Sequence, residues 1–336
     1  MPNFEDLPHE EQLALLERVA KNAVAHYDVP SDVSVEMINL SENATYRVDD
    51  HATSRKWALR VHREGYHSYA AIQSEHAWTD ALREQAGVIT PVIVPGKDGK
   101  NIQSVEAEGM PGGPRNVVMF DWESGIEPPE ENLIGPFELL GSVSAQMHKH
   151  SKHWQRPEWF ERYTWDFETS IGDKPHWGRW QDGMGVNDEN QALFGRTAEL
   201  INKRLQAFGQ GPDRWGLVHC DIRLANLLIE GSITKVIDFD DCGFSWFMYD
   251  CATALSFIEG RKDVPELIQS WVKGYRSVME LSQEDEAEIP TFIMLRRLLL
   301  VAWIGSHSET DLAQSMGLDY TKETENLCEK YLTNFS

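Results

Sequence analysis

The stretch VHCDIRLAN at residues 218–226, followed by DFD at residues 238–240, decides how this chain folds. It places Asp221 five residues before Asn226, and a second carboxylate, Asp238, follows twelve residues later. Phosphoryl transfer from ATP needs a carboxylate that takes the proton from an attacking hydroxyl, and oxygen ligands for Mg²⁺. We therefore interpret Asp221 as a catalytic base, and Asn226 and Asp238 as metal ligands.

The alternative is structural. Asp221 and Asn226 are also common turn formers, Asp238 would then be a strand terminator, and His219 a buried hydrogen-bonding residue. The spacing favours the catalytic interpretation, because the protein-kinase catalytic loop H-R-D-x-x-x-x-N is likewise followed by D-F-G. For His219 itself we favour a structural role, in which it holds the loop backbone.

Composition excludes some partners. The 336 residues include 31 basic and 54 acidic side chains, which gives a formal net charge of -23. Such a chain has no basic surface for the phosphates of a nucleic acid or for an anionic membrane, so we expect neither partner. The charge is compatible with a cationic substrate, and a soluble charged surface is the simpler explanation. The sequence does not predict an oligomeric state.

The cysteines and the apolar segments indicate a cytoplasmic protein. The four cysteines show neither zinc-site spacing nor the density of a disulfide scaffold, so reduced thiols are expected. Residues 1–28 lack the apolar segment of a signal peptide, and the apolar run at 298–305 is too short to cross a bilayer.

The order of predicted elements indicates an α+β fold with two lobes. The first part alternates strands and helices, with strands at 33–40, 45–48, 56–62, 92–94 and 117–120, and helices at 10–26 and 69–86. The second part is mainly helical, with helices at 134–150, 188–208, 265–281 and 290–304, and strands at 227–229 and 235–237. We predict a nucleotide-binding lobe at 1–123, with a small antiparallel sheet and a helix, and a larger catalytic and substrate-binding lobe at 124–336. The connection between them is expected near 120–125.

Candidate nucleotide-binding residues lie in the first lobe. Ala58 and Arg60 occupy the positions of A and K in the kinase motif V-A-I-K, and period-two alternation places both on one face of a strand. Ala58 would lie over the adenine and Arg60 on the phosphates, with Glu75 from the following helix holding the cation. Phe120 and Trp122, near the lobe connection, are assigned to the same site. An ordinary surface arginine and glutamate are the alternative.

With these motifs the chain resembles the aminoglycoside phosphotransferase and choline kinase-like group, whose fold is similar to that of protein kinases. Its H-G-D-x-H-x-x-N loop matches His219, Asp221 and Asn226, and its I-D-F/W-x segment matches residues 237–239. A later family aspartate matches Asp250, and the resemblance implies a buried carboxylate that braces the catalytic loop. These motifs are typical of the superfamily rather than of one substrate.

Some positions depart from the pattern. Arg60 replaces the usual lysine; it can grip phosphate bidentately but with a different geometry. Cys220 and Arg223 stand where the family often has glycine and histidine. The first hairpin, residues 41–46, is similar to the E-N-x-x-Y loop of homoserine kinase-like members and lacks a glycine-rich loop. Asn43 there is a candidate phosphate contact, with a plain polar turn as the alternative.

Candidate acceptor-site residues follow the catalytic motifs. Residues 154–180 are dense in aromatic and acidic side chains, which suit an ammonium group, although helix packing explains any single ring. Asp240, Arg223 and Trp246 are further candidates for contact with the substrate or a second metal ion. Asp240 would lie on the same strand face as Asp238, and turn formation is its alternative.

The leading hypothesis is an ATP- and Mg²⁺-dependent kinase for a hydroxyl group of a small molecule, such as an amino acid, amino alcohol, sugar or aminoglycoside. One alternative is a protein Ser/Thr kinase, which the short stretch of residues 238–250 without A-P-E disfavours. The other is a non-catalytic nucleotide-binding pseudokinase scaffold, suggested by Arg60 and the missing glycine loop.

Overall fold

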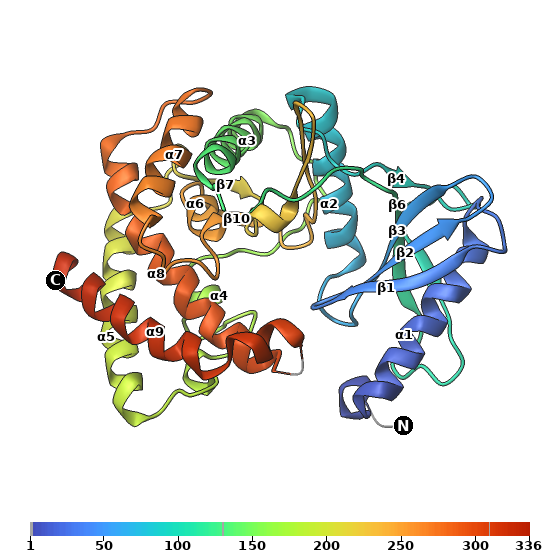
Figure 1. Ribbon diagram of the computed structural model, residues 1–336, viewed down its shortest axis with the longest axis horizontal. Helices are drawn as coiled ribbons and strands as arrows, with labels where there is room; N and C mark the ends of the chain where they lie inside the picture. Colours follow the sequence, from blue (N-terminus) through green and yellow to red (C-terminus); the bar gives the residue numbers. More distant parts are fainter. Residues whose placement is uncertain (1–2, 130, 309) are drawn as a thin grey trace. The chain divides into compact units, whose positions relative to one another are not determined.

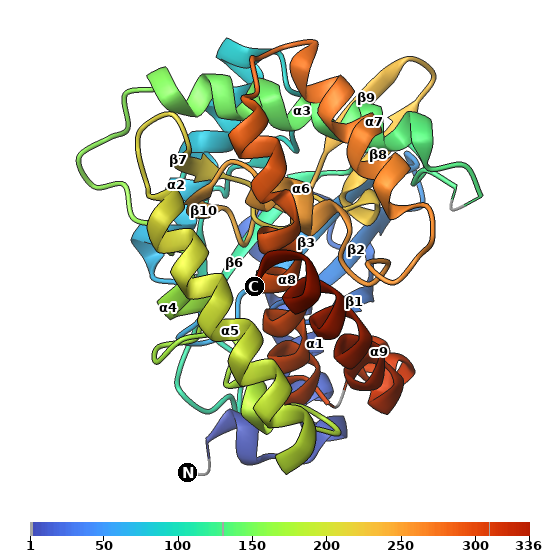
Figure 2. The same cartoon turned by 90° about the vertical axis from the view of Figure 1, so that its left-hand side faces the viewer.

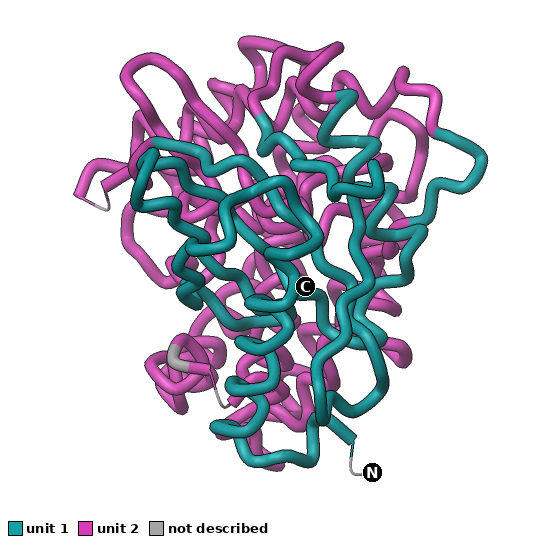
Figure 3. The backbone as a smooth tube through the Cα atoms, turned by 90° about the vertical axis from the view of Figure 1, so that its right-hand side faces the viewer, with its two compact units in different colours: residues 1–81, 90–124, 157–161 teal, residues 82–89, 125–156, 162–336 magenta. Residues whose placement is uncertain are grey.

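The computed structural model describes residues 3–129, 131–308 and 310–336. The chain forms two compact units, shown in two colours in Figure 3. The first comprises residues 1–81, 90–124 and 157–161, and the second comprises residues 82–89, 125–156 and 162–336. The assignment of domains to 1–123 and 124–336 stays a prediction.

The first unit contains an antiparallel sheet in the order β1-β2-β3-β6-β4, with β5 also paired to β6 (Figure 1). Its strands are β1 Ser34–Leu40, β2 Ala44–Asp50, β3 Arg55–Val61, β4 Ile93–Val94, β5 Gln103–Val105 and β6 Arg115–Asp121. The predicted strands are present, and the short β5 is an addition. In the register of β3 and β6, Ala58 pairs with Phe120 and Arg60 with Val118.

Alternation along the strands gives this sheet two different faces. One face packs on α1 (His9–Ala23), whose apolar residues at helical spacing, such as Leu16 and Val19, join Leu59 and other strand residues in one buried cluster. The other face meets α2 (Tyr69–Ala81), where Ile72 packs with Val118. Arg60 is buried between the apolar residues of this second face.

The predicted helix at 69–86 changes character near its end. The α-helix stops at Ala81, and residues Leu82–Ala86 form a π-helical turn. The change coincides with the boundary at 81/82 between the first and the second unit. Similarly, α1 is extended by a 3₁₀ turn, Val24–His26.

The second unit is mainly helical, and Figure 2 shows α5, α8 and α9 packed side by side. Its helices are α3 Ile134–His153, α4 Phe167–Ser170, α5 Asp188–Phe208, α6 Tyr249–Ala254, α7 Val264–Arg276, α8 Gln283–Ser306 and α9 Asp311–Phe335. Helices α3 and α7 approach closely at glycines. A methyl group on Gly141 would lie 1.9 Å from the carbonyl oxygen of Trp271.

Helix α8 is the core of this unit, with every residue from Glu288 to Ile304 except Pro290 buried. It is longer than predicted: it begins at Gln283, not Pro290, because Ser282 caps it by accepting a hydrogen bond from the Asp285 amide. By length and composition α8 could cross a membrane, but 78% of its apolar window is buried inside the protein, as in the core helix of a globular domain.

Two small ladders frame the catalytic segment. The strand β7 (Trp215–Val218) pairs with β10 (Gly243–Trp246), and β8 (Leu227–Glu230) forms a hairpin with β9 (Ile233–Val236). The strands β8 and β9 were predicted, whereas their pairing as a hairpin and the strands β7 and β10 were not. Paired strands therefore hold both ends of the loop that carries Asp221 and Asn226, between β7 and β8. They also hold both ends of the segment that carries Asp238, between β9 and β10. The predicted α+β class is confirmed.

Candidate active site

The loop at residues 219–226 brings Asp221 and Asn226 together. It ends in a 3₁₀ turn, Leu224–Asn226, which folds the amide of Asn226 back onto the loop. Asn226 Nδ2 donates to the Asp221 carbonyl oxygen at 2.8 Å and to its Oδ2 at 3.1 Å. Because the amide nitrogen is used inside the loop, Oδ1 of Asn226 is the atom that a cation would contact.

A buried carboxylate holds the backbone of this loop. Asp250, in the first turn of α6, is fully buried, and its Oδ1 accepts from the Cys220 amide at 2.8 Å. Its Oδ2 accepts from the His219 amide at 3.2 Å and contacts Nε2 of His148 at 2.9 Å. A buried carboxylate with several donors stabilises the position of the backbone that it binds. This arrangement matches the bracing role that the family resemblance implies.

His219 connects the loop to the segment that carries Asp238. Its Nε2 lies 3.1 Å from the Ile237 carbonyl oxygen, and its Nδ1 accepts from the Asp221 amide at 3.3 Å. The Ile237 amide in turn donates to the Asn226 carbonyl oxygen at 3.0 Å. Both ring nitrogens of His219 serve the backbone, and the backbone of Asp238 is placed beside Asn226.

Two residues of the site have strained backbones. Cys220 has φ 66° and Asp238 has φ 62°, in the left-handed region that residues with a side chain seldom adopt. Such conformations cost about 1–3 kcal/mol each and are found most often at functional sites. Asp238 is exposed.

The prediction that Asp240 shares a strand face with Asp238 is wrong. Strand β9 ends at Val236, and the left-handed turn at Asp238 breaks the alternation, which leaves Asp240 buried. The segment is held by Arg162, which donates to the carbonyl oxygens of Cys242, at 2.5 Å, and Asp240. The role of Asp240 in binding substrate or metal stays a prediction.

Two other candidates for the acceptor site, Trp246 and Arg223, contact other residues of the protein. Trp246 is buried, donates to the Gly209 carbonyl oxygen at 2.7 Å and packs edge-on against Trp215. This packing accounts for Trp246, and its place in an acceptor pocket stays a prediction. Arg223 Nε lies 3.3 Å from Asp221 Oδ2, and its guanidinium lies over the Phe257 ring. Arg223 therefore contacts the proposed base.

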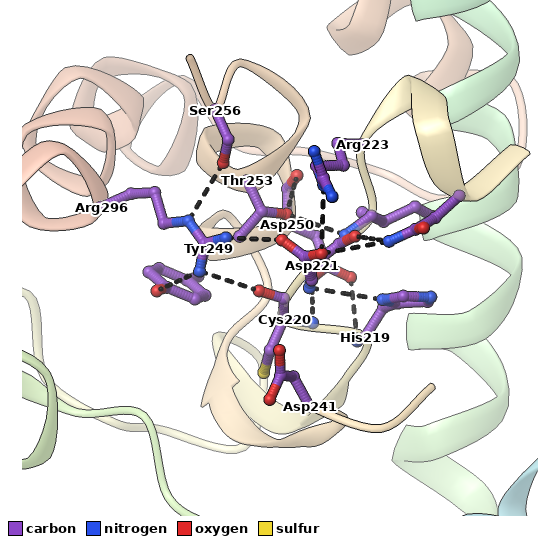
Figure 4. Close-up of polar contacts among 12 residues, drawn as sticks. His219, Cys220, Asp221, Arg223, Asp241, Tyr249, Asp250, Thr253, Ser256 and Arg296 are labelled. Atoms are coloured by element: carbon purple, nitrogen blue, oxygen red, sulfur yellow. Dashed lines mark hydrogen bonds and ion pairs between the residues drawn. The ribbon is translucent and has the colours of Figure 1, made fainter. Parts of the chain in front are cut away.

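Arg296 is a further residue of this site that the sequence motifs did not predict. This residue of α8 donates from Nη2 to Asp221 Oδ1 at 2.5 Å and from Nε to Ser256 at 3.0 Å (Figure 4). Burial alone would lower the pKa of Arg296, but Tyr249 and Asp221 raise it, and the net shift is upward. A signal was present in the sequence, because Arg296 and Arg297 interrupt an otherwise apolar stretch.

The cation that lies against the aromatic segment, residues 154–180, is a side chain of the protein itself, Arg296. The Arg296 guanidinium lies 5.1 Å from the ring centre of Trp177, and Trp177 packs against Trp165. Trp165 also donates from Nε1 to the Asp241 carbonyl oxygen at 2.9 Å. These contacts support the packing interpretation for both tryptophans.

The nucleotide-site candidates lie in the first unit. Arg60 Nη1 is 2.8 Å from Glu75 Oε1, and both side chains are buried. The guanidinium also lies over the Phe120 ring, which pairs with Ala58 across the sheet. The ion pair of Arg60 with Glu75 agrees with the sequence prediction, the position of Phe120 beside them was not predicted, and the contact of these residues with a nucleotide stays a prediction.

Asn43 and Trp122 complete this set. Asn43 Oδ1 accepts from the Arg63 amide at 3.0 Å, which favours the polar-turn alternative for Asn43. Trp122 is partly exposed, and its amide donates to the Lys56 carbonyl oxygen at 3.3 Å. The Trp122 ring is therefore accessible in this unit.

Comparisons with known proteins agree with the motifs. A family model described as phosphotransferase enzyme family (APH) matches residues 38–287. The structure of a microcompartment-associated aminopropanol kinase is 45% identical, covers 94% of this chain and 97% of its own, and has a TM-score of 0.86.

Two more distant relatives are amicoumacin kinases. That of Bacillus subtilis (strain 168) is 25% identical, in an alignment that covers 84% of this chain and 83% of the relative. The amicoumacin kinase hAmiN, solved with AMP-PNP, Ca²⁺ and Ami, is 22% identical with a TM-score of 0.75, over 95% of this chain and 96% of that one. The latter likeness concerns the fold.

Proposed function

This chain belongs to the phosphotransferase enzyme family (APH), and on that premise we propose an ATP- and Mg²⁺-dependent kinase for the hydroxyl group of a small amino alcohol. The observation that carries the proposal is the catalytic loop, in which Asn226 binds Asp221 and the backbone of Asp238 lies beside Asn226. Kinase activity on a small molecule follows from the family, and the nucleotide, the metal and the acceptor are the proposed parts.

Each residue of the loop would have a separate role. Asp221 accepts the proton of the acceptor hydroxyl and orients that group for attack. Asn226 Oδ1 and the Asp238 carboxylate are hard oxygen donors, which fit Mg²⁺. When bound, Mg²⁺ neutralises the charge that develops on the transferred phosphoryl group. Asp250 and His219 keep the loop in the conformation that these roles need.

The first unit supplies a candidate for phosphate binding. Arg60 is held by Glu75, and a guanidinium fixed in this way can bind phosphate oxygens without losing further rotamer freedom. The replacement of the usual lysine is therefore compatible with nucleotide binding. The pseudokinase scaffold is disfavoured instead by the catalytic loop, since a scaffold needs neither the base Asp221 nor the metal ligands Asn226 and Asp238. We expect the enzyme to act in the cytoplasm, where its buried cysteine thiols stay reduced.

The amino alcohol is proposed from the 45% identical relative, an aminopropanol kinase that covers almost the whole chain. The net charge of -23 favours the approach of an ammonium group to this protein. Sugars, amino acids and aminoglycosides are the competing acceptors, and the same fold accommodates several of them.

The test measures ADP release with Mg²⁺-ATP against a panel of amino alcohols, hydroxyl amino acids, sugars and aminoglycosides. We expect the highest kcat/KM for a short amino alcohol, and Asp221→Asn should lower kcat at least about 100-fold, because it removes the base. Preferred turnover of a sugar or an aminoglycoside would contradict the acceptor class. Full activity of Asp221→Asn would contradict the mechanism.

A further inference from the structure

A buried arginine holds one oxygen of the proposed base. Arg296 is 2% exposed, and its nitrogen atoms face polar groups of the catalytic loop and of the α6 region (Figure 4). The partners are Asp221 Oδ1 at 2.5 Å, Ser256 Oγ at 3.0 Å, the Cys220 carbonyl oxygen at 3.4 Å and Tyr249 Oη at 3.5 Å. The Trp177 ring covers the guanidinium. Its geometry is therefore fixed from several directions.

The free-energy cost of burying a guanidinium must be offset by the interactions that it makes. Transfer of a guanidinium from water into a protein core is costly, and a well-packed apolar side chain is often at least as stabilising as a buried ion pair. Arg296 makes its ion pair with Asp221, a residue of the proposed chemistry. The charge of Arg296 therefore acts on the carboxylate of the proposed base.

The adjacent Arg297 shows what a structural arginine looks like in the same helix. Arg297 pairs with Glu259 at 2.8 Å and binds Thr324 at 2.7 Å, so it ties α8 to α9 and to the segment after α6. Neither of these partners belongs to the catalytic loop. The two neighbouring arginines of α8 thus serve different parts of the molecule.

The two oxygens of Asp221 have unequal surroundings. Oδ1 faces Arg296, whose side chain is 3% exposed, whereas Oδ2 faces Arg223, whose side chain is 32% exposed. Oδ2 also accepts the amide of Asn226 at 3.1 Å, a neutral donor. The cation beside Oδ1 is therefore enclosed, whereas the cation beside Oδ2 is partly exposed to solvent.

We propose that Arg296 is a positioning residue, which holds Oδ1 of Asp221 so that Oδ2 takes the proton from the acceptor hydroxyl. The inference rests on the proposed function. In the reaction the acceptor O–H bond breaks, its proton goes to Oδ2, and the freed electron pair forms the new O–P bond. The bond between the γ-phosphorus and the oxygen that leaves with ADP breaks at the same time.

The test compares Arg296→Met and Arg296→Lys with a control, Arg204→Met. Arg204 on α5 also forms an ion pair with α8, through Glu288 at 2.7 Å, but does not contact the loop. We expect Arg296→Met to lower kcat about 100-fold, with the KM of the acceptor changed less than about threefold. Arg296→Lys should recover at least about tenfold of that loss. Arg204→Met should lower the melting temperature and leave kcat within about twofold.

A double-mutant cycle separates positioning from stability. If Arg296 acts through Asp221, Arg296→Met should lower the residual kcat of Asp221→Asn by less than about threefold. A loss as large as in the wild-type background would overturn the inference. So would a folded Arg296→Met, or a folded Arg296→Gln if the former does not fold, with wild-type kcat. The same cycle in unfolding free energy, without substrate, should show coupling between the two positions, and additivity would overturn the pairing.

Different results would overturn the proposed function and the role of Arg296. An inactive wild type, or an Asp221→Asn variant with full activity, would overturn the proposed function and this inference together. Normal loss of activity in Asp221→Asn with unaffected Arg296 variants would overturn the inference alone.

Discussion

The residue Cys220 stands where a glycine would carry no backbone strain. Its φ of 66° places a side chain in the left-handed region, and its thiol is buried near the Val218 and Gly243 carbonyl oxygens. The cost of this conformation is about 1–2 kcal/mol and is larger for a β-branched residue. The strain sits one residue before the proposed base.

We therefore predict that two substitutions at this position differ in their effect on stability. Cys220→Gly should stay within about 1 kcal/mol of wild-type stability, because relief of strain offsets lost burial. Cys220→Val should lose more than about 2 kcal/mol, since its branched side chain opposes the left-handed backbone. Urea denaturation monitored by tryptophan fluorescence measures both. Equal stability of the valine and glycine variants would show that the backbone strain is unimportant.

At the scale of the elements, the packing of α3 against α7 in the second unit depends on a close approach of their backbones. Gly141 of α3 faces the Trp271 carbonyl oxygen of α7 so closely that a methyl group would overlap it, at 1.9 Å. Backbone atoms cannot move aside as a flexible side chain can, so the helices would have to separate. Gly135, also on α3, has no atom within 4 Å of such a methyl group.

The pair Gly141→Ala and Gly135→Ala tests this contact within one helix. Gly141→Ala should destabilise the protein by about 2 kcal/mol or more, because α3 and α7 lose their packing. Gly135→Ala should be neutral or stabilise by up to about 1 kcal/mol through helix propensity. Thermal denaturation of both variants gives the comparison. A stable Gly141→Ala would mean that α3 and α7 can move apart at little cost.

The sequence predicted local features better than distant ones. Asp221 and Asn226 share one loop, and Arg60 and Glu75 lie on consecutive elements, so the spacing of the kinase motifs sufficed to predict both pairs. Arg296 reaches Asp221 across 75 residues, which no local pattern reveals. Strands β7 and β10 were missed for the same reason, since each has four residues and its partner is remote. The left-handed turn at Asp238 was hidden because that residue is not glycine.

At the scale of the whole molecule, buried acids with raised pKa values set the response to alkali. Burial raises the pKa of Cys328 in α9 from 9.0 to about 11, and that of Tyr331 from 10.0 to about 12. Burial likewise raises the pKa values of Tyr27 and Tyr46 in the first unit. The folded state therefore keeps protons that the unfolded state releases, and stability is complete below about pH 9 and falls above it.

We predict that the unfolding free energy drops steadily between pH 9 and 11. Each buried group contributes up to about 1.4 kcal/mol to the drop for every pKa unit by which its folded-state pKa exceeds its unfolded-state pKa. Cys328→Ala removes one titrating group, so the drop should be smaller than in the wild type. Urea denaturation of both proteins at pH 8, 9, 10 and 11 measures the slopes. A parallel decline of the two proteins would contradict the role of Cys328.

The interleaved order of the two units limits how evolution can exchange their parts. Residues 157–161 return to the first unit, where the Glu161 amide donates to Ser74 at 2.8 Å and its carboxylate accepts from Ser68 at 2.7 Å. A single crossover near residue 124 would join the first unit of one parent to a returning segment from the other. Recombination between homologous genes should therefore yield functional hybrids mainly when both parents carry compatible residues at 157–161. Lineages of this enzyme are expected to diverge by point substitution rather than by exchange of whole lobes.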